Sequence, residues 1–186
     1  MILEDIEALN KAVKLTGDRQ LVPFSPVHVQ MMELGIFDKA YLEHLPDWLG
    51  MLSGMATLGY AYTGAKAGKP MCCFGVIKLW PGVAEVWLIP DADVTSVARS
   101  FHRVTKLFFD IIMSELHLVR LQATVHTLNE PADKWIRSLY FQEEGVLRRF
   151  GPDGSDAKMY SRLRDDSNER PVLSPESLTS SATARP

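Results

Sequence analysis

The spacing of hydrophobic residues changes along the middle of this chain. Between Val94 and Leu116 apolar residues recur every three to four positions, which predicts a long amphipathic helix with a wide buried stripe. Asp93 stands before the stripe and is expected to cap the helix. The flanking segments Val83–Ile89 and Val119–Thr127 are rich in β-branched and apolar residues and predict strands. The middle of the chain therefore reads strand, helix, strand.

The C-terminal part continues this alternation. A helix is expected to open at Asn129, and a strand approaches Phe150. Gly151–Gly154 reads as a turn, after which Ala157–Leu163 returns as a closing strand. Such an order predicts an α/β protein of the α+β type, with a mixed, mostly antiparallel sheet flanked by helices.

The N-terminal part predicts short helices followed by a three-strand meander. Pro46 is expected to kink or split one of these helices, because proline lacks the N–H that a helix interior needs. The expected helices cover Ile2–Leu15, a segment from Ser25-Pro26 to Leu34, and Asp38–Leu49; the strands cover Arg19–Phe24, Thr57–Gly64 and Pro70–Trp80.

The composition changes sharply after residue 164. Residues 1–164 are expected to form a single domain, with residues 1–16 as its N-terminal helix. Residues 165–186 are rich in Ser, Pro, Thr and charge, and carry almost no large apolar side chains. Such a segment buries too little surface to offset its ordering entropy, so we expect it to be disordered or held by a protein partner or a second copy of the chain.

The overall composition excludes several functional classes. Of 186 residues, 46% are hydrophobic and 23% charged, with a net charge of −3, so the chain has no general affinity for nucleic acid or an anionic membrane. No apolar run approaches the ~20 residues of a membrane span, and the first residues lack the features of a signal peptide. Cys72 and Cys73 are adjacent and suit a reducing cytoplasm. The five histidines show no metal-ligand spacing.

Several residues of the second half carry a resemblance to a known family. Asn129 is followed by the small residue Ala132, then by Phe141 and Gly145, and Glu85 opens the middle strand. In this pattern the chain resembles the GCN5-related N-acetyltransferases over roughly Arg19 to Leu163. The resemblance implies that fold, acetyl-CoA as the cofactor, and transfer of its acetyl group to an amine.

The resemblance also implies roles for particular residues. In this family two neighbouring strands splay apart and the pantetheine arm lies between them, which places Trp87 and Ile89 at the cofactor. The diphosphate rests on backbone N–H groups at the start of the long helix, which implies contacts from Thr95, Ser96 and Val97, a favourable position for an anion. Asn129 is implied to bond the pantetheine arm or to cap its own helix. Glu85 is implied to be the general base.

Two departures from the family pattern are visible. The loop from Pro90 to Ala98 contains no glycine and no leading basic residue, and Asp91 and Asp93 are expected to place negative charge beside the diphosphate. The position of the family's frequent tyrosine acid holds Ile136, which leaves Tyr140 as the candidate proton donor.

These departures leave a second interpretation open. A catalytically inactive protein of this fold would serve in assembly, as do the acetyltransferase-like internal virion proteins of short-tailed phages. The segments Phe101–Asp110 and Arg148–Gly154 resemble that group, in which case the protein is expected in the host cytoplasm or the virion. An active enzyme needs the Pro90–Ala98 loop to accept a diphosphate, whereas an assembly protein does not.

Overall fold

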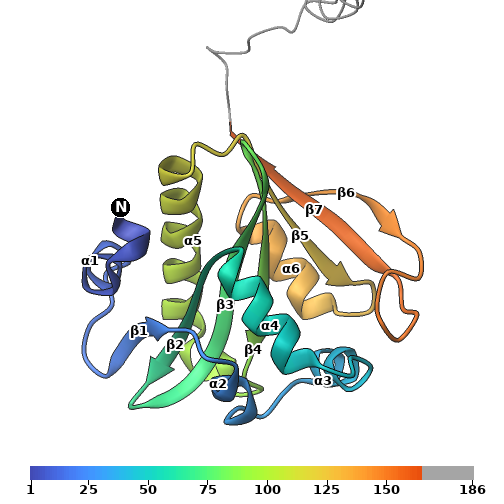
Figure 1. The fold of residues 1–186 in the computed structure, drawn as a ribbon, viewed down its shortest axis with the longest axis horizontal. Coiled ribbons are helices and arrows are strands. Elements are labelled where there is room, and N and C mark those ends of the chain that lie inside the picture. Colours follow the sequence, from blue (N-terminus) through green and yellow to red (C-terminus); the bar gives the residue numbers. More distant parts are fainter. Residues whose placement is uncertain (165–186) are drawn as a thin grey trace, which may run out of the picture.

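Seven strands form one sheet that divides the molecule into two layers of helices (Figure 1). The computed structural model describes residues 1–164, so the expectation for residues 165–186 lies outside the described residues. The strand order is β1-β2-β3-β4-β5-β7-β6, and all neighbouring strands are antiparallel except β4 and β5. This is the mixed, mostly antiparallel sheet that the sequence predicts. The strands are β1 (Arg19–Pro23), β2 (Gly59–Lys66), β3 (Lys69–Trp80), β4 (Val83–Pro90), β5 (Arg120–His126), β6 (Gln142–Leu147) and β7 (Ala157–Leu163).

The helices are short except for one. They are α1 (Ile6–Ala12), α2 (Pro26–Gln30), α3 (Ile36–Glu43), α4 (Trp48–Thr57), α5 (Ala98–Glu115) and α6 (Glu130–Ser138), with single 3₁₀ turns at η1 (Ile2–Glu4) and η2 (Val94–Val97). Pro46 falls in the break between α3 and α4, which confirms the expected split. None of the helices in residues 1–164 is both long and apolar enough to cross a membrane.

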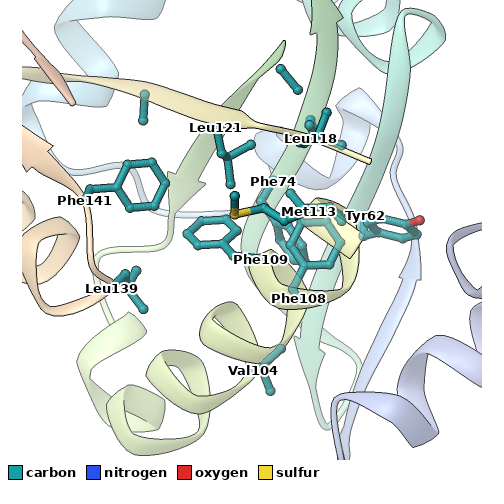
Figure 2. Close-up of a cluster of buried hydrophobic side chains, with 14 of the residues drawn as sticks. Tyr62, Phe74, Val104, Phe108, Phe109, Met113, Leu118, Leu121, Leu139 and Phe141 are labelled. Carbon is teal, nitrogen blue, oxygen red and sulfur yellow. The ribbon is translucent and has the colours of Figure 1, made fainter. Parts of the chain in front are cut away.

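Each face of the sheet has its own hydrophobic cluster. Residues from α1, α5 and α6 pack on one face, and residues from α2, α3 and α4 pack on the other. Cys72 belongs to the first cluster and Cys73 to the second, as expected for neighbours in a strand. The larger cluster joins α5 to the sheet through Tyr62, Phe74 and Phe108, whose rings meet edge-on or tilted at centroid distances of 5.0–5.9 Å (Figure 2). Because Phe108 is fully buried there, this packing fixes α5 against the sheet.

The long helix begins later than its hydrophobic pattern predicts. The chain forms the 3₁₀ turn η2 first, and α5 starts at Ala98. Asp93 was expected to cap the helix, but its side chain makes no capping hydrogen bond and is exposed. The expectation was wrong because the Ser96 N–H, a donor that a capping side chain would bind, donates to the backbone carbonyl of Asp93 at 2.9 Å within the 3₁₀ turn. The Asp93 backbone N–H donates to the side chain of Asp91, with an N···O distance of 2.9 Å.

Asp91 is buried and anchors the end of β4. Its side chain is 1% exposed and accepts hydrogen bonds from the backbone N–H groups of Glu33 and Asp93, with Lys69 Nζ at 3.4 Å. Burial by itself would raise the pKa of Asp91, but these donors together lower it. The charge of Asp91 is therefore turned into the fold, contrary to its expected place beside a diphosphate.

The Asp91 anchor gives the first prediction. Asp91→Ala leaves two backbone donors without an acceptor and should lower the free energy of unfolding by about 2–4 kcal/mol in urea at pH 7. Because the folded-state pKa of Asp91 is depressed, the difference from the wild type should shrink as the pH falls below the ordinary carboxyl pKa, near 3.8. Asp93→Ala is the matched control, with an expected change within about 0.5 kcal/mol. Equal effects of the two substitutions would show that Asp91 is no anchor.

Candidate functional site

Strands β4 and β5 begin side by side and then separate (Figure 1). They pair in parallel over only three residues each, Val83–Glu85 and Arg120–Gln122. Past this point β4 remains paired with β3, and β5 with β7. The inner edges of both strands therefore carry backbone N–H and C=O groups without a strand partner in the described part of the chain. The last paired residues, Glu85 and Gln122, mark the point of separation.

A cavity of about 330 Å³ opens between the separated strands. Its walls include residues 86–90 of β4 and 123–126 of β5. It reaches α3 and α4 on one face of the sheet and α5 and α6 on the other, so it passes through the sheet. Since the resemblance implies transfer of an acetyl group from acetyl-CoA to an amine, we label the part beside α3 and α4 the acceptor side and the part beside α5 and α6 the donor side.

Glu85 lies at the point of separation and lines the cavity. Its Oε2 accepts a hydrogen bond from Gln122 Nε2 at 2.8 Å, which holds the carboxylate in place. No hydrogen bond to its second oxygen, Oε1, is found among residues 1–164. The residue predicted as general base thus presents a fixed carboxylate to the cavity.

Helix α3 supplies two polar side chains that the sequence analysis missed. Asp38 and Tyr41 line the acceptor side, one turn apart on the helix. Burial raises the pKa of Asp38 to about 6, an effect that its own backbone N–H offsets only in part. Burial raises the pKa of Tyr41 as well, with further contributions from Glu85 and Asp153. The spacing of Asp38 and Tyr41 marks a shared helix face, but nothing in the sequence shows that this face meets Glu85.

His126 and Asp153 complete the titratable groups on the acceptor side. The His126 ring packs on Phe37 with a centroid distance of 4.6 Å, and its Nδ1 accepts the Leu128 N–H at 3.1 Å. That bond places the proton of the neutral ring on Nε2. The Ser155 side chain and backbone N–H lower the pKa of Asp153, which stays ionised at neutral pH.

The donor side contains an unsatisfied indole. Trp135 lines the cavity and stacks on Phe101 at a centroid distance of 4.9 Å, while its buried Nε1 has no hydrogen-bond partner within residues 1–164. Asn129 lines the same side and caps α6 by accepting the Ala132 N–H at 3.2 Å. A buried donor without a partner is costly in a folded protein, and a bound ligand would satisfy it.

The start of α5 is free of side-chain capping in the described chain. The N–H groups of Ser96 and Ala98 already donate within η2, whereas those in the first turn of α5 have no helical carbonyl to bind. Arg19, on β1, reaches this turn and donates from Nη1 to Ser100 Oγ at 2.7 Å. The structure thus brings to the helix start a basic residue that the Pro90–Ala98 loop itself lacks.

The structure places the site residues predicted from the sequence in three locations. Glu85, Trp87, Ile89 and Asn129 line the cavity, while Thr95, Ser96 and Val97 form η2 at the start of α5. Trp87 lies against Gly75, where an added Cβ would come within 2.7 Å of the indole nitrogen. Tyr140 is not brought to the cavity: it is 60% exposed, and its hydroxyl accepts a hydrogen bond from Lys106 Nζ at 2.7 Å.

Several solved structures with a similar fold are acetyltransferases. The chain is similar to the ribosomal L7/L12 α-N-protein acetyltransferase RimL in complex with coenzyme A, with a TM-score of 0.64 and 15% identity over 82% of this chain and 98% of that one. It is also similar to Ard1 from Thermoplasma volcanium (TM-score 0.63, 14% identity, 79% and 98% covered). The ribosomal-protein-S5-alanine acetyltransferase from Vibrio fischeri gives a TM-score of 0.61 at 14% identity, with 83% and 98% covered.

These likenesses establish the fold, which is that of the GCN5-related N-acetyltransferases. No family model matches the sequence, and no curated protein sequence matches it.

The buried carboxyl of Asp38 gives the second prediction. Because its folded-state pKa, about 6, lies above the usual value of 3.8, the ionised form destabilises the fold increasingly as the pH rises from 4 through 6. Asp38→Asn should therefore raise the free energy of unfolding at pH 8 by on the order of 1–2 kcal/mol, after allowance for solvent screening, and change it little at pH 4. Urea unfolding at the two pH values measures this. Asp18→Asn, at an exposed carboxylate, is the control, and a gain of the same size at both pH values would contradict the assignment.

Proposed function

We propose that this protein is an N-acetyltransferase that moves an acetyl group from acetyl-CoA to an amine. The observation that carries the proposal is the cavity through the sheet, which begins where β4 and β5 separate at Glu85. Such a passage lets a donor and an acceptor approach the same point from opposite faces of the sheet. Bringing two reactants together in this way is itself a large part of catalysis.

The donor side fits the chemistry of coenzyme A. The unpaired inner edge of β4, including Trp87 and Ile89, offers backbone groups to the amides of the pantetheine arm, as an added strand would. The free indole N–H of Trp135 would satisfy its missing hydrogen bond on the same arm. The uncapped start of α5, next to Thr95–Val97, would hold the diphosphate together with Arg19. Acetyl-CoA would supply the acetyl group as a thioester.

Glu85 is the residue that we propose as general base. An amine attacks the thioester carbonyl carbon only through its lone pair, so its ammonium form must first lose a proton. The free Oε1 of Glu85 accepts that proton, while Gln122 holds the carboxylate at the point of separation. The new N–C bond then forms and the C–S bond breaks, and the nitrogen gives up its second proton, which restores the phenol that protonates the departing thiolate.

The thiolate that leaves needs a proton, and Tyr41 is the phenol on the cavity wall. Burial, Glu85 and Asp153 raise the pKa of Tyr41 above its ordinary value, so its hydroxyl holds at neutral pH the proton that the thiolate would take. We propose Tyr41 in this role in place of Tyr140, whose hydroxyl is bonded to Lys106 outside the cavity.

The alternative of an inactive assembly protein rests on the glycine-free loop before α5. Glycine normally allows the backbone to approach phosphate oxygens closely. In this chain η2 occupies that place, and Asp93 remains exposed beside it. An assembly protein of this fold, such as an internal virion protein, would not bind coenzyme A.

Titration with acetyl-CoA tests the proposal and decides between the two functions. Ligand at ~100 times its dissociation constant stabilises the folded state by about 2.7 kcal/mol, so the melting temperature should rise by several degrees. ATP is the control for an adenine nucleotide without the pantetheine arm. Glu85→Gln should keep this rise but lower kcat for acetyl transfer by about 10²–10⁴-fold. No rise with millimolar acetyl-CoA would leave the assembly function.

Arg19 supplies a separate prediction about the diphosphate. Arg19→Gln should weaken coenzyme A binding by about tenfold, because it removes a charge-assisted contact. It should leave the affinity for pantetheine unchanged, since pantetheine lacks the diphosphate. Isothermal titration calorimetry measures both affinities. Arg103→Gln is the matched control, because Arg103 lies on α5 one turn after Ser100. A parallel loss for both ligands would place Arg19 in a purely structural role.

A further inference from the structure

We infer that the acceptor is a compact primary ammonium with an apolar body and no acid group of its own, held between Asp38 and Glu85. The inference rests on the proposed acetyl transfer and concerns the acceptor side of the same cavity. Four features of the described residues support it: the sign of the charge, the absence of a cation near Asp38 and Glu85, the aromatic walls, and the small volume.

The charge of the cavity lining has one sign. Three carboxylates line it, those of Asp38, Glu85 and Asp153, and its lining includes neither lysine nor arginine within residues 1–164. The remaining titratable groups on the lining are Tyr41 and His126, and His126 Nδ1 accepts the Leu128 N–H. The field inside such a low-dielectric cleft attracts cations and repels anions.

Asp38 and Glu85 have no cationic partner among the described residues. Neither takes part in an ion pair in the described chain, and Glu85 is bonded only to the neutral amide of Gln122. Some other carboxylates of the molecule are paired, such as Glu144 with Arg120 and Asp133 with Lys158. A half-buried carboxylate without a cation costs free energy, and a bound ammonium would offset that cost with charge-assisted hydrogen bonds.

The walls around Asp38 and Glu85 are apolar and aromatic. Phe37, Tyr41 and Phe150 line the acceptor side, together with Met51 and Met55 of α4. Aromatic faces attract an ammonium and also cover an apolar body. Because the whole cavity measures about 330 Å³ and the donor takes part of it, the body is limited to a few carbon atoms or one ring.

The same lining explains why an acid group is excluded. An amino acid carries its carboxylate two bonds from the nitrogen, so binding the ammonium at Asp38 and Glu85 would bring that carboxylate among like charges with no lysine or arginine on the lining to compensate. Like-charge contact and the loss of hydration both oppose such binding. The cavity therefore selects the decarboxylated amine over its parent amino acid.

Three related probes test this selectivity: 2-phenylethylamine, the neutral 2-phenylethanol, and phenylalanine, which adds only the carboxylate. Calorimetric titration of the full chain at pH 7.5, with and without coenzyme A, should show the amine binding at least about tenfold more tightly than either of the others. Asp38→Asn and Glu85→Gln should each weaken binding of the amine by about tenfold and leave the affinity for the alcohol unchanged. Asp18→Asn should change neither.

Binding is measured here without acetyl transfer, so the two proposals are separable. A protein that binds coenzyme A but ranks the three probes equally, or binds none of them, overturns this inference alone. A protein that prefers the amine but does not respond to coenzyme A overturns the acetyltransferase proposal and leaves the ammonium site standing. Loss of alcohol binding in Asp38→Asn would show that Asp38 shapes the cavity and does not bind the cation.

Discussion

The separation of β4 from β5 after Glu85 and Gln122 is the constraint on which the rest of this structure depends. Leaving two inner strand edges unpaired is unfavourable, so other contacts must hold the strands apart. The end of β4 is held by Asp91, whose backbone N–H donates to Met71 O at 2.9 Å and whose side chain accepts the Glu33 N–H. The end of β5 stays paired with β7, and Phe37 packs on His126 beside it. The cavity exists because each strand is held at its outer side.

The start of α5 and the cavity lining carry different charges. The start of α5, which is not part of the lining, has the positive end of the helix dipole and Arg19, which suits a phosphorylated donor. The acceptor side has Asp38, Glu85 and Asp153, which suit an ammonium. This difference in charge would set the direction from which each reactant approaches, before any shape-specific contact is made. Asp38 is half-buried and forms no ion pair among residues 1–164, an arrangement that is costly to stability and that a bound cation would offset.

The fold was predictable because strand periodicity and turn residues are local features of the sequence. The strand at Ala157–Leu163 was placed to the residue, and the break at Pro46 follows from the missing N–H of proline. Glu85 and Asn129 were nominated through their family pattern, and both line the cavity. Asp38 and Arg19 were not, because each acts on a partner far along the chain: Asp38 shares a cavity with Glu85, and Arg19 bonds Ser100. Such long-range contacts depend on how α3 and β1 pack against the rest of the fold, and hydrophobic periodicity does not encode that packing.

The start of α5 shows how one buried side chain changes what a loop sequence implies. In the sequence alone, Asp91 and Asp93 place two negative charges where a diphosphate would bind. In the folded chain Asp91 is turned inward and accepts hydrogen bonds from two backbone N–H groups, and the 3₁₀ turn η2 precedes α5. One of the two charges is thereby removed from the site, and Arg19 brings a positive one from another strand. The glycine-free loop therefore argues less strongly against an anionic donor than its composition suggests, because charge at a helix start depends on where side chains point.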